Sequence, residues 1–144
     1  MLKAIHHTAI STPDLDRLKK FYTDVMGFEV DFEFSWPTGF DVADNILGLK
    51  DTAANVAMIK LGDFRLELFQ FSSPDPKPGD LNRPVVDHGL THLAFTVENV
   101  EAEYKRLTNL GMVFHCPPQE LGTSRVTYGR DPDGNVVELM EDIS

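Results

Sequence analysis

Cysteine is almost absent from the sequence, since Cys116 is the only one among 144 residues. A single cysteine excludes an internal disulfide and lacks the paired spacing of a thiolate zinc site. No run approaches the ~20 apolar residues of a membrane-spanning helix, and the N-terminal residues show no apolar signal-peptide block. We therefore expect a cytoplasmic protein that has no membrane partner.

Basic residues are also scarce, with 13 Lys and Arg against 23 Asp and Glu and a formal net charge of −10. The absence of any basic run weighs against nucleic acid, whose affinity depends on neutralising phosphates, and against anionic membrane surfaces. The apolar fraction of 42% is typical of a globular chain. The length suffices for one domain with a core, so we predict a single domain over residues 1–144.

What the sequence does contain is an internal repeat. Two modules, about 1–71 and 88–144, are joined by a proline-containing linker, 72–87. Each module is predicted to run strand, helix, strand, strand, strand. The first strand of each carries a histidine, the helix ends near a glycine (Gly27 or Gly111), and the last strand carries a glutamate between aliphatic residues.

Hydrophobic spacing and turn residues set the expected element bounds. The helix of the first module begins at a cap on Thr12 or Asp14 and ends at Gly27, and the second helix covers 98–110. A short helix is possible within 40–49. The expected strands are 4–10, 28–34, 55–61 and 64–71 in the first module and 89–97, 112–115, 125–129 and 136–140 in the second.

Strand alternation makes four residues candidate metal ligands: His7, Glu67, His92 and Glu138. Successive side chains on a strand point to opposite faces, so a strand whose apolar set packs on the helix turns its histidine or glutamate away from it. One such glutamate usually lies on a solvated face, but two at matching positions, each with a histidine, favour ligation. Imidazole and carboxylate suit Ni, Co, Zn, Fe or Mn, and a six-coordinate ion would keep two positions for water or substrate.

With these four residues the sequence resembles the vicinal oxygen chelate superfamily, which includes glyoxalase I, methylmalonyl-CoA epimerase, extradiol dioxygenases and fosfomycin-resistance enzymes. The motifs that carry the resemblance cover residues 7–15, 21–28, 92–97 and 131–139. It implies an α+β fold in which paired βαβββ modules form a cupped eight-stranded mixed sheet with helices on its outer face. It also implies one divalent metal ion held by the four residues, and a homodimer.

The order of ligand types, His, Glu, His, Glu, is most similar to that of glyoxalase I. The resemblance to methylmalonyl-CoA epimerase is weaker at one ligand, because that enzyme typically has glutamine where this sequence has Glu67. The 35–53 insertion departs from the glyoxalase I pattern, and no basic set matches a glutathione pocket. Arg125 is a candidate for binding a substrate carboxylate, with a surface arginine as the alternative. An apolar pocket wall can be drawn from Trp36, Phe40, Phe69 and Phe71, although core packing explains the last two equally well.

The sequence therefore favours a metal-dependent lyase or isomerase that acts on a small oxygenated carbonyl substrate through a metal-stabilised enediolate. Glu138 or Glu67 would be the general base. Two alternatives stay open. One is an iron(II) dioxygenase of the same superfamily, and the other is a resistance-type protein that binds a small molecule.

Overall fold

The structure is a computed structural model that describes every residue from Met1 to Ser144. The chain forms two compact units, Met1–Pro78 and Gly79–Ser144, and each is described by itself. The order of elements confirms the expected α+β fold with two βαβββ-like modules. No helix has the length and apolar character needed to cross a membrane.

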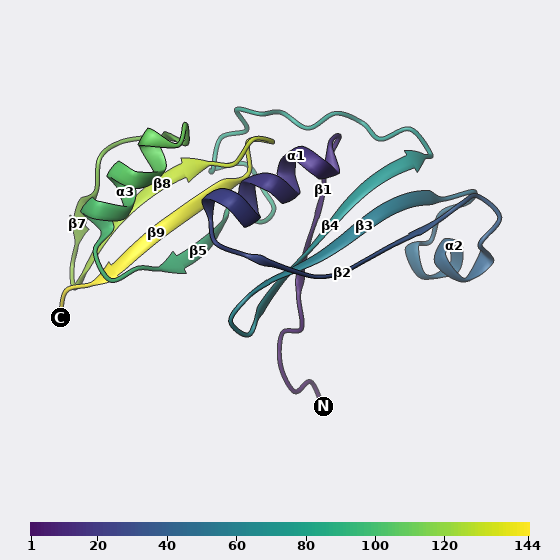
Figure 1. Cartoon of the computed structure of the whole chain (residues 1–144), viewed down its shortest axis with the longest axis horizontal. Coiled ribbons are helices and arrows are strands. Elements are labelled where there is room, and N and C mark those ends of the chain that lie inside the picture. The colour runs from purple at the N-terminus through teal and green to yellow at the C-terminus, as the bar shows by residue number, and fades with distance from the viewer. The chain divides into compact units, whose positions relative to one another are not determined.

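The first unit is a four-stranded mixed sheet with one main helix on one of its faces (Figure 1). Its elements are β1 (Thr8–Ser11), α1 (Leu15–Lys20), the π-helical turn η1 (Phe21–Val25), β2 (Glu29–Trp36), α2 (Asp41–Leu47), β3 (Ala53–Leu61) and β4 (Phe64–Ser73). The strand order is β1-β4-β3-β2, with β1 parallel to β4 and the other pairs antiparallel. Helix α1 contacts β3 and β4, so the opposite face of this sheet is not covered by α1.

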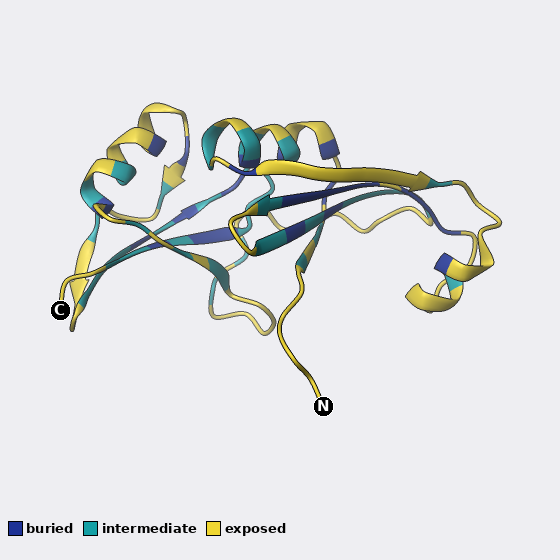
Figure 2. Ribbon diagram, turned by 60° about the horizontal axis from the view of Figure 1, so that its bottom comes forward, coloured by how far each residue is buried: buried dark blue, intermediate teal, exposed yellow.

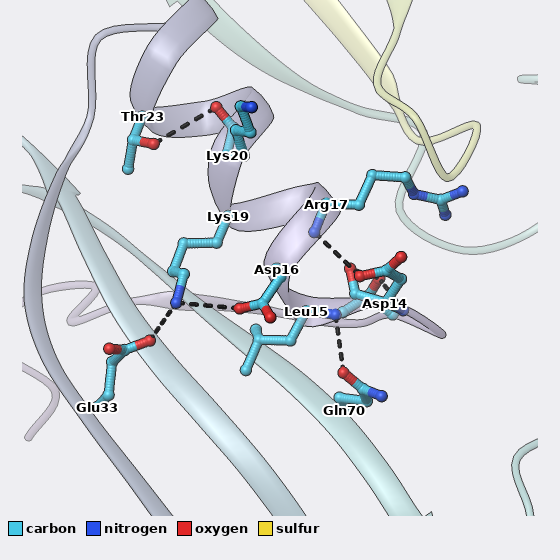
Figure 3. A network of polar contacts seen from close by, with 10 residues as sticks. Asp14, Leu15, Asp16, Arg17, Lys19, Lys20, Thr23, Glu33 and Gln70 are labelled. Atoms are coloured by element: carbon cyan, nitrogen blue, oxygen red, sulfur yellow. Dashed lines mark hydrogen bonds and ion pairs between the residues drawn. The ribbon is translucent and has the colours of Figure 1, made fainter.

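Helix α1 is fixed to the sheet by polar contacts at its start and along its side (Figure 3). Asp14 caps the helix, since its carboxylate accepts a hydrogen bond from the N–H of Arg17 at 3.0 Å. The N–H of Leu15 donates to Gln70 of β4 at 2.9 Å, and Lys19 forms an ion pair with Glu33 of β2. These contacts join the first and last turns of α1 to two different strands.

The core of the first unit lies between α1 with η1 and one face of the sheet. Five large side chains there are fully buried: Leu18, Tyr22, Ile59, Leu66 and Leu68. Strand β2, in contrast, is exposed along almost its whole length and forms one edge of the sheet (Figure 2). The burial of Leu66 and Leu68 thus identifies the face of β4 that packs against the helix.

The second unit repeats this arrangement with shorter strands. Its elements are β5 (His92–Thr96), α3 (Val100–Asn109), β6 (Val113–Phe114), β7 (Gln119–Leu121), β8 (Ser124–Arg130) and β9 (Val136–Asp142). The strand order is β5-β9-β8-β6, with β7 paired to β8, and α3 packs on β8 and β9. The buried side chains between helix and sheet are Val100, Leu107, Thr127, Val137 and Leu139.

The strand count differs from the expected single sheet of eight. The structure has nine strands in two sheets, because β7, which alternation did not predict, pairs with β8. The first strand begins at Thr8 rather than at residue 4, and its register runs from Thr8 opposite Leu66 to Ser11 opposite Phe69. His7 therefore precedes β1 instead of lying within it.

The turn between β8 and β9 is held by hydrogen bonds of the partly buried Arg130 and by a glycine. The guanidinium of Arg130 donates to the carbonyl oxygens of Gly134 at 2.7 Å and of Arg83 at 3.0 Å. The second hydrogen bond connects the segment around Arg83 to this turn. Gly134 has a φ of +82°, and a Cβ there would lie 2.2 Å from the carbonyl oxygen of Leu81. Only glycine fits both the backbone conformation and this close approach.

We expect Gly134→Ala to destabilise the protein far more than Gly122→Ala. Both glycines have positive φ, which costs an alanine about 1–2 kcal/mol, but nothing lies within 4 Å of a Cβ at Gly122. At Gly134 the Leu81 backbone must also move, which adds about 1–3 kcal/mol. Urea unfolding of the two variants measures the difference, and equal midpoints would show that the Leu81 contact does not constrain this turn.

Candidate metal centre

In the first unit His7 and Glu67 form a direct side-chain pair. His7 Nε2 lies 3.1 Å from Glu67 Oε2, and the glutamate side chain is only 14% exposed. Glu67 sits between the fully buried Leu66 and Leu68, so alternation turns its carboxylate to the face of the sheet opposite α1. The structure thus brings together the two residues that the sequence paired within this module.

The second unit contains the equivalent pair. His92 Nε2 lies 2.9 Å from Glu138 Oε2, and the Glu138 side chain is 13% exposed. Glu138 lies between Val137 and Leu139, which are buried on the α3 side. The same ring nitrogen, the same carboxylate oxygen and nearly the same burial recur in both units, as expected of a repeated site.

The pair geometry fits a divalent metal ion. Two ligands at right angles on an ion, each about 2.1 Å from it, lie about 3.0 Å apart, close to the 3.1 and 2.9 Å seen here. In both histidines Nδ1 contacts the preceding residue, His6 at 2.7 Å and Thr91 at 2.8 Å. A second partner on Nδ1 is the usual arrangement for a histidine that ligates through Nε2.

Each unit by itself supplies two of the four candidate ligands. Neither unit brings three or more His, Cys, Asp or Glu side chains together as a metal site. Binding of one ion by all four residues therefore stays a prediction. Cys116 is free and exposed and is not part of either pair.

Tyr128 is a neighbour of the second pair that the sequence did not single out. It lies opposite Glu138 in the β8–β9 register, and its ring centroid is 4.8 Å from that of His92. Burial, with a smaller effect of the Glu138 charge, raises the pKa of Tyr128 above its usual value near 10. The phenol therefore stays protonated at neutral pH and can donate a hydrogen bond beside the pair. The sequence shows which face of the strand Tyr128 shares with its neighbours. Only the β8–β9 register shows that it lies opposite Glu138.

Arg125 is not brought to the His92–Glu138 pair. It lies opposite Glu141 in the β8–β9 register, on the same face as Thr127 and Leu139, whereas Glu138 and Tyr128 share the other face. Its guanidinium forms an ion pair with Glu120 of β7 at 2.7 Å. The proximity of the Glu120 carboxylate raises the pKa of Arg125. The geometry therefore gives no support to a substrate-binding role for Arg125 at this pair.

Comparison with known proteins places the chain in a family. The model of the Glyoxalase/Bleomycin resistance protein/Dioxygenase superfamily matches residues 4–139, and the chain belongs to this superfamily. It is 33% identical over 141 residues to the uncharacterized protein YaeR of Escherichia coli (strain K12), with 97% of each chain covered. The crystal structure of a glyoxalase family protein from Bacillus cereus has a TM-score of 0.88 at 24% identity, covers 100% of this chain and 97% of its own, and shows the same fold.

The named relatives include several enzyme activities. The chain is 38% identical over 107 residues to a 2-epi-5-epi-valiolone epimerase from Actinomyces sp, which covers 72% of this chain and 57% of that relative. Lower similarity extends to a mitochondrial methylmalonyl-CoA epimerase of Mus musculus at 26% identity and to a lactoylglutathione lyase of Schizosaccharomyces pombe at 25% identity. Epimerases and lyases thus both occur among the relatives of this chain.

We predict that His92→Ala weakens nickel binding by more than about 100-fold. Removing only the hydrogen-bond partner of a metal ligand already costs about 10–100-fold in affinity. The reason is that the variant removes a proposed ligand atom outright while leaving the buried residues of β9 in place. Isothermal titration of metal-free protein with Ni²⁺ gives the affinity. His88→Ala, which removes a histidine that lies outside the strands and outside both pairs, serves as the control and should bind nickel normally. Equal affinities of the two variants would mean that His92 is not a ligand.

Proposed function

We propose that this protein is a divalent-metal-dependent lyase or isomerase of the glyoxalase type, acting on a small oxygenated carbonyl substrate. The observation that carries the proposal is the repeated His–Glu pair, 3.1 Å apart in one unit and 2.9 Å apart in the other. His7, Glu67, His92 and Glu138 would together hold one ion. Two neutral imidazoles and two carboxylates give a ligand set that suits Ni, Co, Zn, Fe or Mn.

When bound, the ion would supply Lewis-acid stabilisation of the negative charge that develops on a substrate oxygen next to an acidic carbon. The protein's own residues would then handle the proton. A glutamate carboxylate, Glu138 or Glu67, accepts the proton from the carbon beside the carbonyl and later returns it. Both carboxylates are suited to this role because they are mostly buried and each is held by a histidine.

Two neighbours distinguish Glu138 from Glu67. Tyr128 lies opposite Glu138 and contacts His92, so a neutral hydrogen-bond donor stands beside that pair. The cross-strand neighbour of Glu67 is Met58, which has no comparable donor. The polar surroundings of Glu138 therefore support Glu138 as the residue that moves the proton, with Tyr128 binding a substrate oxygen.

The similarity to proteins named as epimerases supports the isomerase half of the proposal. An epimerase inverts one carbon centre, which requires loss and return of a group on that carbon, most simply a proton. The same proton transfer at a carbon beside a carbonyl is required of a glyoxalase-type isomerisation. We therefore place the proposed reaction in this shared class of proton transfer and leave the carbon skeleton of the substrate open.

We expect nickel-loaded protein to accelerate exchange of the carbon-bound protons of a small α-hydroxyketone, such as hydroxyacetone, with solvent deuterium. Glu138→Gln should retain the metal but slow the exchange by at least about 100-fold, because general base catalysis contributes 10²–10⁴-fold. Glu67→Gln should be milder. Proton NMR follows the exchange, and metal removal by a chelator should abolish it.

The outcomes of this experiment separate the alternatives. If Glu67→Gln is inactive and Glu138→Gln is normal, Glu67 is the base. If both exchange normally, the carboxylates only bind metal. Consumption of oxygen with a catechol, in the absence of any exchange, would support the iron(II) dioxygenase, and tight ligand binding without metal would support the resistance-type binding protein.

We also propose that the protein is a homodimer. In the first unit β2 leaves one sheet edge open, and the exposed side chains of Val42 and Ile46 on α2 lie outside the core. Light scattering should give twice the chain mass of 16.2 kDa at micromolar concentration. A mass of one chain at high micromolar concentration would reject the dimer.

A further inference from the structure

The face of the first sheet that carries Glu67 is ordered from apolar to charged along the strands. The β2–β3–β4 register places Phe32 and Met58 level with Glu67, and it places Lys60 level with Arg65, two residues away on one side. On the other side the neighbours are aromatic. The aromatic wall consists of Phe32, which is level with Glu67, and of Phe34, Trp36, Phe69 and Phe71 beyond it, all of which share the face of Glu67 by strand alternation.

The rings of the aromatic wall contact one another in a definite pattern. Phe69 and Phe71 are stacked with an interplanar angle of 3° and centroids 5.4 Å apart. Trp36 meets both edge-on, at 77° to Phe69 and 80° to Phe71, so the planes form a corner. Phe32 and Phe34 continue the wall along β2 and are 49% and 44% exposed. Phe40, an expected member of the wall, instead precedes α2.

The orientation of Trp36 is fixed from the 35–53 insertion. Its indole N–H donates to the hydroxyl of Thr52 at 3.1 Å, and Thr52 is fully buried. The Thr52 hydroxyl and N–H both donate to the carboxylate of Asp44 on α2. These hydrogen bonds hold the pKa of Asp44 below its usual value. The ring is therefore held by a hydrogen-bond chain, and packing alone does not determine its position.

The charged residues on the same face indicate on which side of Glu67 an apolar part of the substrate would lie. Lys60 and Arg65 both pair with Asp31, at 3.3 and 3.4 Å, and these side chains remain partly exposed. Next to these paired and partly exposed charges, a flat apolar substituent would bury less apolar area than next to the aromatic wall. On the aromatic side the rings are already ordered by their contacts with one another, so a ring of the substrate would contact them at little cost in side-chain entropy.

From this arrangement we infer that the substrate carries a flat apolar substituent next to its oxygenated carbons, and that Phe69, Phe71 and Trp36 select it. The inference rests on the proposed function, because it takes the oxygenated part to lie at the His7–Glu67 pair. Phe69 is two residues from Glu67 on the same strand face, a separation of about 7 Å. One aromatic ring attached to a chelating group spans this distance.

A matched pair of hydroxamic acids tests the inference on nickel-loaded protein. Acetohydroxamate and benzohydroxamate offer the same two neighbouring oxygens and differ only in a methyl or a phenyl group. We expect benzohydroxamate to bind at least about tenfold more tightly, which corresponds to one favourable ring contact and its buried area. Trp36 is the only tryptophan, so its emission should change with benzohydroxamate and stay unchanged with acetohydroxamate.

Phe69→Leu should reduce the preference for benzohydroxamate to less than about threefold and leave the acetohydroxamate affinity unchanged, because it keeps an apolar side chain and removes the ring. Phe71→Leu provides a second variant if the first folds poorly. The control is Phe114→Leu, which removes a ring from a contact with Tyr104 at 4.9 Å in the second unit. It should keep the full preference.

The possible failures are distinguishable. If neither hydroxamate binds the nickel-loaded protein, the proposed metal site fails. If both bind with equal affinity and the Trp36 emission does not respond, the metal site stands and the aromatic substituent is rejected. If Phe69→Leu and Phe71→Leu change the mass in light scattering without changing the preference, the aromatic wall contacts a second copy of the chain and the inference is overturned.

Discussion

The candidate site depends on the two-residue alternation of β4 and β9. Leu66 and Leu68 must be buried against α1, so Glu67 between them is turned to the opposite face. Val137 and Leu139 impose the same orientation on Glu138. Each carboxylate is thus positioned by the burial of its neighbours on a paired strand. A register slip of one residue would place a carboxylate in the core and expose two aliphatic side chains, which makes the site as well defined as the core itself.

The parts of the fold that local pattern determines were readable from the sequence. Capping residues begin α1 and α3 and glycines follow their ends, and the clear alternation of apolar and polar residues fixed the faces of Glu67 and Glu138. Strand β8 shows where this reasoning stops. Its α3 face carries Thr127, whose hydroxyl donates to the carbonyl of Cys116 at 2.6 Å, and Gly129, which leaves space for Met112. The residues of β8 that pack on the helix are thus less apolar than Val126 and Tyr128 on the opposite face. Alternation of apolar and polar residues therefore could not assign the face of Arg125.

Features that arise from pairing between distant segments were not accessible in this way. Strand β7 has three exposed residues and no alternation, and it exists because it pairs with β8. The position of Tyr128 beside His92 follows from the β8–β9 register. The link from Asp44 through Thr52 to Trp36 joins a helix, a loop and a strand edge, and nothing in the spacing of these residues signals it. Such contacts are properties of the folded chain.

The irregularity of β2 has a consequence for how this protein avoids aggregation. The register of β2 against β3 shifts between Val30 and Phe32, and Asp31 lies at the shift. A free sheet edge with a regular row of N–H and C=O groups can template pairing with any extended chain. The bulge interrupts that row, so β2 does not offer a continuous ladder of backbone groups to a second extended chain. An exposed strand with three aromatic residues can therefore remain at the edge of the sheet without starting a fibril.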